Sequence, residues 1–197
     1  MAFDQHILVV MSADIKETTH SKFHALLRDQ IRNEFNASHQ YIATAVYFAN
    51  VDLPQLAKHF YAQAVEERNH AMMIVQYFLD RDITVELNGV DGAKTVFTDA
   101  REPIALALAQ EETVTDQVVN LASTAREEGD YIGEQFMQWF IKEQIEEVAK
   151  MRTLLNVADR AGHNLFDLEL FVAREMNTDV SVADTGAPQA AGGSIQG

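Results

Sequence analysis

Apolar side chains recur at helical spacing along most of the chain, in four long stretches with breaks between them. The stretches run over about residues 19–50, 54–80, 100–128 and 131–161. Because residues three and four positions apart share one face of a helix, each stretch predicts a long amphipathic helix whose apolar face points to a common core. A shorter stretch of the same kind, residues 164–175, predicts a fifth, C-terminal helix.

The connections between these helices predict how they are arranged. Pro54 and the pair Gly129–Asp130 mark two tight turns, so the first two long helices and the last two form antiparallel hairpins. Residues 81–99 lack helical periodicity and make an unusually long connection for a compact domain. At about 3.3 Å per extended residue, this connection can run the whole length of the bundle. We therefore predict an all-α fold, a four-helix bundle with one long crossover and a short fifth helix.

The two ends of the chain differ from this pattern. Residues 1–18 show no coherent periodicity, and we expect a flexible N-terminal extension within which Met11 offers a second translation start. Residues 177–197 contain few large apolar side chains, so we expect a disordered tail that cannot bury enough apolar surface to offset the entropy of ordering it. The folded domain is therefore expected to span residues 19–176.

Charge and cysteine content narrow the chemistry. The chain of 197 residues holds 15 Lys and Arg against 30 Asp and Glu, a net charge of −15, which disfavours binding to nucleic acids and to anionic membranes. It has 0 Cys, so disulfides, thiolate nucleophiles and Cys-ligated metals are excluded. No apolar run approaches the roughly 18 residues of a membrane span, and the first residues lack a basic leader. We therefore expect a cytoplasmic protein.

Polar residues interrupt the apolar stripe of all four long helices. These residues are Glu34 in the first helix, Glu67 and His70 in the second, Glu111 in the third, and Gln144 and Glu147 in the fourth. An unpaired charge in a core costs several kcal/mol, so one core-facing carboxylate on every helix indicates a shared partner.

The same acids lie at matched depths in the two hairpins. Glu34 stands about 16 residues before the first turn, and Glu67 stands about 13 residues after it. Glu111 and Glu147 each stand about 18 residues from the second turn. At ~1.5 Å per residue, each pair reaches about the same level of the bundle. A cluster of like charges is tolerable only with cations, and oxygen-rich ligands with one imidazole suit iron or manganese better than zinc. The pattern predicts a dimetal carboxylate site.

The segments that carry these acids resemble the ferritins, and most closely the non-haem bacterial ferritins. The resemblance covers about residues 20–175, including NEFNASHQY, AVEERNHAMM, ALAQEETVTDQ and QWFIKEQIEE. It implies a ferroxidase centre with one iron on Glu34, Glu67 and His70, a second iron on Glu67, Glu111 and Glu147, and Gln144 beside them. By the same resemblance, Tyr41 and Trp139 are the family's aromatic neighbours of the site, and packing in the core explains them equally well.

The resemblance also implies what the protein does. Ferritins oxidise Fe(II) to Fe(III) with O2 and store the product as a ferric mineral inside a cage of 24 identical subunits. The expected metal and cargo is therefore iron, the expected co-substrate is O2, and the expected partner is the chain itself.

Two further acidic groups gain a meaning from the resemblance. The family's third iron site, which faces the cavity, falls on Glu66, Glu143 and Glu146. A solvated acidic face is the alternative explanation of these residues. The family's threefold cation channels lie near the acidic turn of Glu127, Glu128, Asp130 and Glu134. An ordinary acidic helix start explains that turn as well.

Two departures from the haem-binding bacterioferritins predict a protein without haem. Those relatives have Met directly after the second-helix Glu, where this chain has Arg68. They also repeat E-x-x-H on the last long helix, where this chain has Gln144 and Glu147. Met72 and Met73 are then expected to be core or interface residues. The remaining histidines are expected at the surface or at helix caps: His6, His20, His24, His39, His59 and His163.

Two other functions remain open from the sequence. A diiron oxygen-activating enzyme with a fixed cofactor would have similar carboxylates, but such enzymes keep more His ligands than the single His70 here. A DNA-protecting mini-ferritin is disfavoured by the charge of −15 and by the fifth helix, whose apolar face we expect to pack at a subunit axis. For the tail, residues 177–197, three alternatives remain open: a segment at the fourfold pore, a packing address for an enclosing shell protein, or no function.

Overall fold

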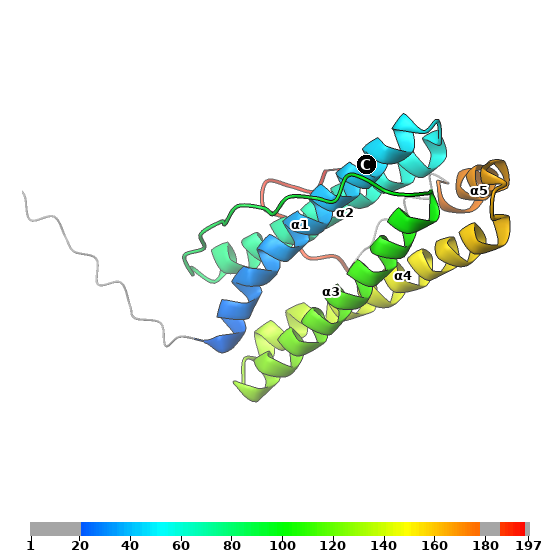
Figure 1. Cartoon of the computed structure of the whole chain (residues 1–197). Coiled ribbons are helices and arrows are strands. Elements are labelled where there is room, and N and C mark those ends of the chain that lie inside the picture. The colour runs from blue at the N-terminus through cyan, green and yellow to red at the C-terminus, as the bar shows by residue number, and fades with distance from the viewer. Residues whose placement is uncertain (1–20, 178–185, 196–197) are drawn as a thin grey trace, which may run out of the picture.

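The computed structural model describes residues 21–177 and 186–195 of the chain. Its elements are α1 (Lys22–Asn50), α2 (Pro54–Asp80), α3 (Arg101–Glu127), α4 (Tyr131–Ala161), α5 (Leu165–Phe171) and a π-helical turn, η1 (Val172–Met176) (Figure 1). The predicted all-α fold is confirmed, and the helix ends match the sequence pattern to within a few residues. None of the described helices is long and apolar enough to cross a membrane. The expectations for residues 1–18 and 178–185 concern parts of the chain outside the described residues.

The helices pair as the connection lengths predict. α1 packs along α2, α3 packs along α4, and α1 also lies against α3. The order around the bundle is therefore α2–α1–α3–α4. This order places the α1–α3 side and the α2–α4 side on opposite faces of the bundle.

Local sequence signals begin and end the helices. Pro54 opens α2, where its missing N–H needs no partner. Asp130 caps α4, because its carboxylate accepts a hydrogen bond from the N–H of Gly133 at 2.9 Å. Gly162 ends α4 with a φ of 56°, a left-handed conformation that glycine adopts without a steric cost.

The crossover between α2 and α3 runs beside α1, as its length predicts (Figure 1). Polar side chains on one face of α1 hold it there. The Nε of Arg32 donates to the carbonyl of Gly89 at 3.1 Å. Two turns further along α1, the amide of Gln40 donates to the carbonyl of Lys94 at 2.9 Å and accepts from the N–H of Lys94 at 2.8 Å. Successive turns of α1 thus bind successive parts of an extended chain.

The apolar core has two parts with a polar layer between them. One cluster lies at the end where α1 begins and contains Phe23, Phe78 and Phe140. The other lies at the end where α1 stops and contains Phe48 and Phe60. Each of these five rings is at most 2% exposed. Apolar packing at both ends therefore encloses the acidic positions near the middle of the helices.

The C-terminal helix buries part of its apolar surface within its own chain, while Phe166 and Leu170 are 80% and 41% exposed. Leu168 and Val172 are 1% and 0% exposed and belong to the second cluster. The Glu169 carboxylate accepts hydrogen bonds from the N–H groups of Gln55 and Leu56, at 2.9 and 2.8 Å, and so caps the start of α2. The expectation that the apolar face of this helix packs at a subunit axis is therefore wrong for Leu168 and Val172, because the end of the bundle accommodates them.

Part of the C-terminal tail packs against α2, which corrects the prediction of disorder for residues 186–195. Ala191 is 6% exposed, and its N–H donates to the carbonyl of Met72 at 2.9 Å. The amide of Asn69 donates to the carbonyl of Ile195 at 2.8 Å and accepts from its N–H at 3.0 Å. A small side chain lets the backbone approach the helix, and the amide satisfies backbone groups, so docking here needs no large apolar residue.

Gly133, in the first turn of α4, provides a test of this packing. A Cβ at this position would overlap Cε1 of Phe23, whose ring is 0% exposed. We predict that Gly133→Ala destabilises the protein by about 1–3 kcal/mol, because the fully packed ring has little room to move. Thermal and chemical unfolding measure the loss. Gly89→Ala is the matched control, since nothing lies within 4 Å of a Cβ there. An equal loss in both variants would contradict the packing argument.

Candidate metal centre

Each long helix contributes one carboxylate to the polar layer between the two apolar clusters. These are Glu34 on α1, Glu67 on α2, Glu111 on α3 and Glu147 on α4, and each is at most 2% exposed. His70, one turn after Glu67, is 3% exposed. The side chains that interrupt the apolar stripes therefore do lie in the core.

Glu34, Glu67 and His70 form a first group of metal-binding side chains. One ligand atom of each lies within 4.8 Å of the other two. Nδ1 of His70 is 3.2 Å from Oε2 of Glu67. The amide of Gln30 donates to Oε1 of Glu34 at 2.8 Å, while Oε2 of Glu34 is buried and has no hydrogen-bond partner among residues 21–177 and 186–195. A cation would satisfy such an oxygen.

Glu111 and Tyr41 belong to the same layer. The Tyr41 hydroxyl donates a hydrogen bond to Oε1 of Glu111, and Oε2 of Glu111 is buried without a partner in the described part of the chain. The ring of Tyr41 also packs against Phe60, with 5.7 Å between the ring centroids. Tyr41 thus contacts both the apolar core and the acidic layer. Both explanations of this residue, core packing and a neighbour of the site, therefore apply.

Gln144 and Trp139 border the layer from α4. Oε1 of Gln144 accepts a hydrogen bond from the Thr115 hydroxyl at 3.1 Å, which ties this amide to α3. The ring of Trp139 meets the imidazole of His70 edge-on, with 5.5 Å between the ring centroids. This ring contact restricts the plane of the imidazole.

A second acidic group draws on α2 and α4. Carboxylate oxygens of Glu66, Glu143 and Glu147 lie within 4.8 Å of one another. Glu146 is exposed and lies outside this group, so the structure differs from the predicted trio. The reason is helical geometry, because position 147 is one turn from 143 and faces Glu66, whereas 146 is rotated toward solvent. Glu147 also forms an ion pair with Lys150 at 2.7 Å, and its Oε2 is buried with no partner that the described residues supply.

Burial and crowding change how these carboxyl groups titrate. Burial raises the pKa of Glu34 well above its ordinary value, and the charge of Glu67 raises it further. Burial likewise raises the pKa of Glu67, with the charge of Glu111 next in effect. The pKa of Glu111 rises to about 7 through burial, although its hydrogen bond from Tyr41 opposes the change. The layer therefore favours bound protons when no cation is present, and a cation would displace them.

The donor set fits iron. The carboxylate oxygens from four helices are hard ligands, and the one imidazole is a borderline ligand. This set suits iron or manganese better than zinc. Among the described residues, three carboxylates on three helices each keep one buried oxygen without a partner: Glu34, Glu111 and Glu147. These oxygens are the strongest structural sign that the layer binds cations.

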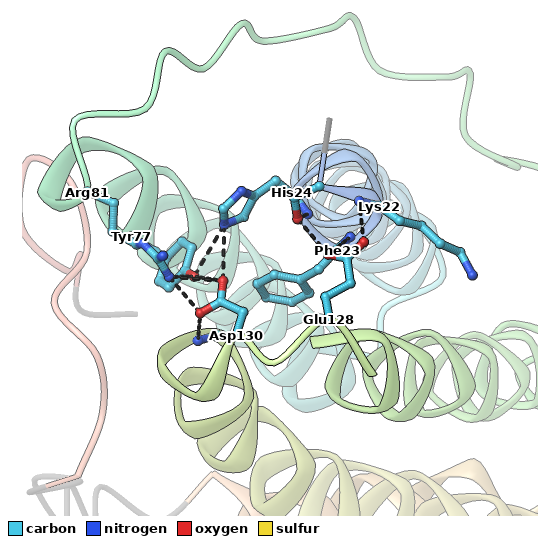
Figure 2. A network of polar contacts seen from close by, with 9 residues as sticks. Lys22, Phe23, His24, Tyr77, Arg81, Glu128 and Asp130 are labelled. Carbon is cyan, nitrogen blue, oxygen red and sulfur yellow. Dashed lines mark hydrogen bonds and ion pairs between the residues drawn. The ribbon is translucent and has the colours of Figure 1, made fainter. Parts of the chain in front are cut away.

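The acidic turn between α3 and α4 joins helix ends (Figure 2). The Glu128 carboxylate accepts hydrogen bonds from the N–H groups of Lys22 and Phe23, at 2.8 and 3.2 Å. Asp130 accepts from the guanidinium of Arg81 at 3.0 and 3.1 Å. The other two acids also have partners: Glu134 pairs with Arg126, and Glu127 accepts from Ser123. These contacts favour the explanation of the turn as an acidic helix start over a cation channel.

Two buried polar residues near the site were missed by the sequence analysis. His59, expected at the surface or at a cap, is 6% exposed, and burial lowers its pKa to about 4. Gln30, which binds Glu34, is 2% exposed. The signal for Gln30 was its place one turn before Glu34 on the same stripe, since a buried carboxylate needs a donor beside it.

Comparisons with known proteins agree on one family. A family model described as "Ferritin-like domain" matches residues 24–161. The chain is 65% identical over 175 residues to "Ferritin BfrB" of Mycolicibacterium smegmatis, covering 89% of this chain and 96% of that protein. It is 36% identical over 152 residues to a "Bacterial non-heme ferritin" of Staphylococcus aureus, covering 77% and 91%. An "open pore ferritin" structure from Archaeoglobus fulgidus shares the fold, with a TM-score of 0.76 at 24% identity, covering 79% of this chain and 97% of that one.

The buried charges of the layer predict how pH acts on the metal-free protein. Because folding raises the pKa of Glu67, the stability that this carboxyl contributes is present below its ordinary pKa of 4.5 and is lost as pH rises through the folded value. Glu67→Gln removes the charge, so it should stabilise the metal-free protein by about 1–4 kcal/mol at pH 8 and by almost nothing at pH 4.5.

Thermal unfolding of chelator-treated protein across this pH range measures the effect. Glu112→Gln is the matched control, because Glu112 is an exposed carboxylate on α3. A gain from Glu67→Gln that is independent of pH would mean that charge burial is not its cause.

Proposed function

The chain belongs to the ferritin family, and we propose that it oxidises Fe(II) with O2 in the polar layer of the bundle and stores the ferric product inside a cage of 24 copies. The observation that carries the proposal is the set of four buried carboxylates, one from each long helix, with His70 beside them. The relatives named above are called ferritins, and this supports iron storage as the function of this chain.

The proposed reaction balances without a further reductant. Two Fe(II) ions each give one electron to O2, which takes up two protons and leaves as H2O2. Hydrolysis of the two Fe(III) ions to mineral releases protons. In total, two Fe(II), one O2 and four waters give two FeO(OH), one H2O2 and four protons. Carboxylate ligands suit this chemistry because hard anionic oxygens stabilise the ferric product.

The carboxylates of the layer share one arrangement that fits iron as a passing substrate. In each of three cases a protein group holds Oε1 and leaves Oε2 without a partner: Gln30 for Glu34, Tyr41 for Glu111, and Lys150 for Glu147. One fixed oxygen keeps the side chain oriented, while the other is open to a cation. We assign one iron to Glu34, Glu67 and His70 and the other to Glu67, Glu111 and Glu147, with Gln144 at the border.

The second acidic group would receive iron from the layer. Glu66 and Glu143 are half-buried, in contrast to the buried acids of the layer, and Glu147 is common to both groups. An ion leaving the layer therefore meets carboxylates that are better hydrated, on the α2–α4 side of the bundle. We propose that this side faces the mineral.

Self-association is supported by the apolar surface of the described chain. Large apolar side chains stay exposed at several places: Val119, Tyr131, Ile132, Ile145 and Phe166 are 52–80% exposed. Exposed apolar residues of this size mark contacts between proteins. The docking of residues 186–195 on α2 argues against a free address for an enclosing shell protein. The proposed compartment is the cytoplasm.

A diiron enzyme with a fixed cofactor is the alternative, and particle size separates the two. Size-exclusion chromatography with iron staining should show a very large hollow particle that retains ferric mineral. A dimer with two tightly bound irons per chain would indicate the enzyme instead. A mini-ferritin that coats DNA would give a smaller particle that shifts DNA on a gel.

Removing the ligands of the first group should abolish rapid iron oxidation. We predict that Glu67→Ala combined with His70→Ala slows the first stopped-flow oxidation phase by at least about 10²-fold, because metal-assisted chemistry needs its ligands. The cage should remain assembled, since buried like charges contribute little to stability. Wild-type oxidation rates in an assembled double variant would refute the assignment.

The second acidic group should act after the first turnover. We predict that Glu66→Ala combined with Glu143→Ala leaves the first oxidation phase within about twofold of wild type and slows the removal of Fe(III) from the layer on repeated iron additions. The slowing follows because Glu147 alone would remain of the receiving group. Glu146→Ala is the matched control, as Glu146 lies outside that group. Identical effects of Glu146→Ala and of the double variant would contradict the division that the structure indicates.

A further inference from the structure

A pocket of about 430 Å³ that is open to solvent lies between α1, α3 and the crossover, and we call it the α1–α3 cavity. Its polar lining consists of Asn33, Asn36, Gln40, Gln110, Thr113 and Gln117. The single charged residue of the lining, Asp91, is paired with Arg32 and accepts from the amide of Asn36. The cavity thus presents neutral amides and a hydroxyl, and it lacks the unpaired carboxylates that would draw a cation inward.

Two buried amide atoms of this lining have no hydrogen-bond partner among the described residues. Nε2 of Gln110 is an unused donor, and Oε1 of Gln117 is an unused acceptor. They belong to residues two turns apart, about 10 Å along α3. Buried polar atoms are costly unless something satisfies them, so the cavity suits small neutral molecules that both donate and accept, such as water and H2O2.

The inner wall of the cavity consists of its two buried lining residues, each one helical turn from a carboxylate of the layer. Ala37 and Val114 line the cavity and are 4% and 5% exposed. Each stands one turn after an acid of the layer, Glu34 on α1 and Glu111 on α3. The lining therefore shares two small apolar side chains with the helix turns next to the iron ligands, and O2 needs no polar partner to pass such groups.

A chain of amides also connects the cavity to the layer. Asn33 of the lining donates to the carbonyl oxygen of the Gln30 side chain at 3.2 Å. Gln30 in turn donates to Oε1 of Glu34 at 2.8 Å. The lining and the iron ligand thus belong to one hydrogen-bonded unit.

The cavity and the second acidic group lie on opposite faces of the bundle. The cavity is on the α1–α3 side, whereas Glu66 and Glu143 are on α2 and α4. One face therefore offers neutral groups and the other offers carboxylates, with the buried layer between them. This difference would separate the routes of charged and neutral reactants, because a carboxylate attracts a cation but does not attract O2.

We propose that the α1–α3 cavity is the passage for the neutral reactants: O2 reaches the layer through it, and H2O2 leaves through it. This inference rests on the proposed function, since only an iron oxidation site in the layer would need such a passage. Iron itself does not use the cavity and is handled on the acidic side.

Narrowing the inner wall tests the passage. Ala37→Leu places three more carbon atoms in the cavity, and Ala37→Val places two, so the second variant serves if the first does not assemble. The first probe is nitric oxide, a neutral diatomic surrogate of O2, mixed anaerobically with Fe(II)-loaded protein in a stopped-flow instrument. We expect its rate of binding to iron to fall severalfold in Ala37→Leu and less in Ala37→Val. The KM for O2 in iron oxidation should rise in parallel, with the rate at saturating O2 kept.

Anaerobic Fe(II) binding, followed by calorimetry and by its rate, should be unchanged in these variants. Ala62→Leu, the same substitution at an exposed position of α2, is the matched control and should behave as wild type. Wild-type nitric oxide and O2 kinetics in an assembled Ala37→Leu cage would overturn the proposal, as would slowed Fe(II) binding, which would make the cavity a cation route. Failure of the wild-type protein to oxidise iron would instead refute the proposed function itself.

Discussion

The burial of several carboxylates in one apolar bundle is the constraint on which the rest of the structure depends. Four acids that are at most 2% exposed face one another, and burial together with mutual repulsion raises the pKa of Glu34 and Glu67. A core of this kind is unfavourable by itself. The fold tolerates it by placing apolar clusters at both ends of the bundle, where Phe23 and Phe60 are fully buried, so that stability comes mainly from the ends and the middle is left for chemistry. Acids outside the layer add to those ends, as Glu128 and Glu169 do by capping α1 and α2.

The long crossover explains why the two faces of the bundle differ. Because it lies along α1, its backbone binds amide and guanidinium side chains, and that face of the bundle acquires neutral or paired groups. On the α2–α4 side, residues 186–195 dock on α2 and cover it only in part. The acids of the second acidic group on that side remain anionic groups, with Glu66 accepting from Gln63 and Glu147 paired with Lys150. One connection, needed to join two hairpins, thus makes the surroundings of the layer unsymmetrical.

Much of this was predictable from the sequence, for definite reasons. The helices and the four acids of the layer follow from periodicity. A polar residue that interrupts the apolar stripe of a long helix must face the core, whatever the details of packing. The membership of the second acidic group did not follow, since Glu146 and Glu147 differ by one residue and only packing shows which faces Glu66. The docking of Ala191 on α2 could not be predicted from the sequence either. It depends on a small side chain and on backbone hydrogen bonds, which amino-acid composition does not reveal. His59 was misplaced because a single polar residue on a helix carries no signal for burial without its neighbours.

Glu147 links the buried carboxylates of the layer to the second acidic group. It belongs to the buried layer and to the half-buried group with Glu66 and Glu143, and it keeps Lys150 on one oxygen while the other has no partner. An ion bound through the open oxygen leaves the ion pair intact, whereas an ion that takes both oxygens must displace the ammonium. Lys150 is partly exposed and can turn toward solvent, and the incoming cation then replaces it as the counter-charge of the buried Glu147. Under the proposed function, a carboxylate shared between two groups can therefore pass an ion from one group to the other while a cation stays beside it at each stage.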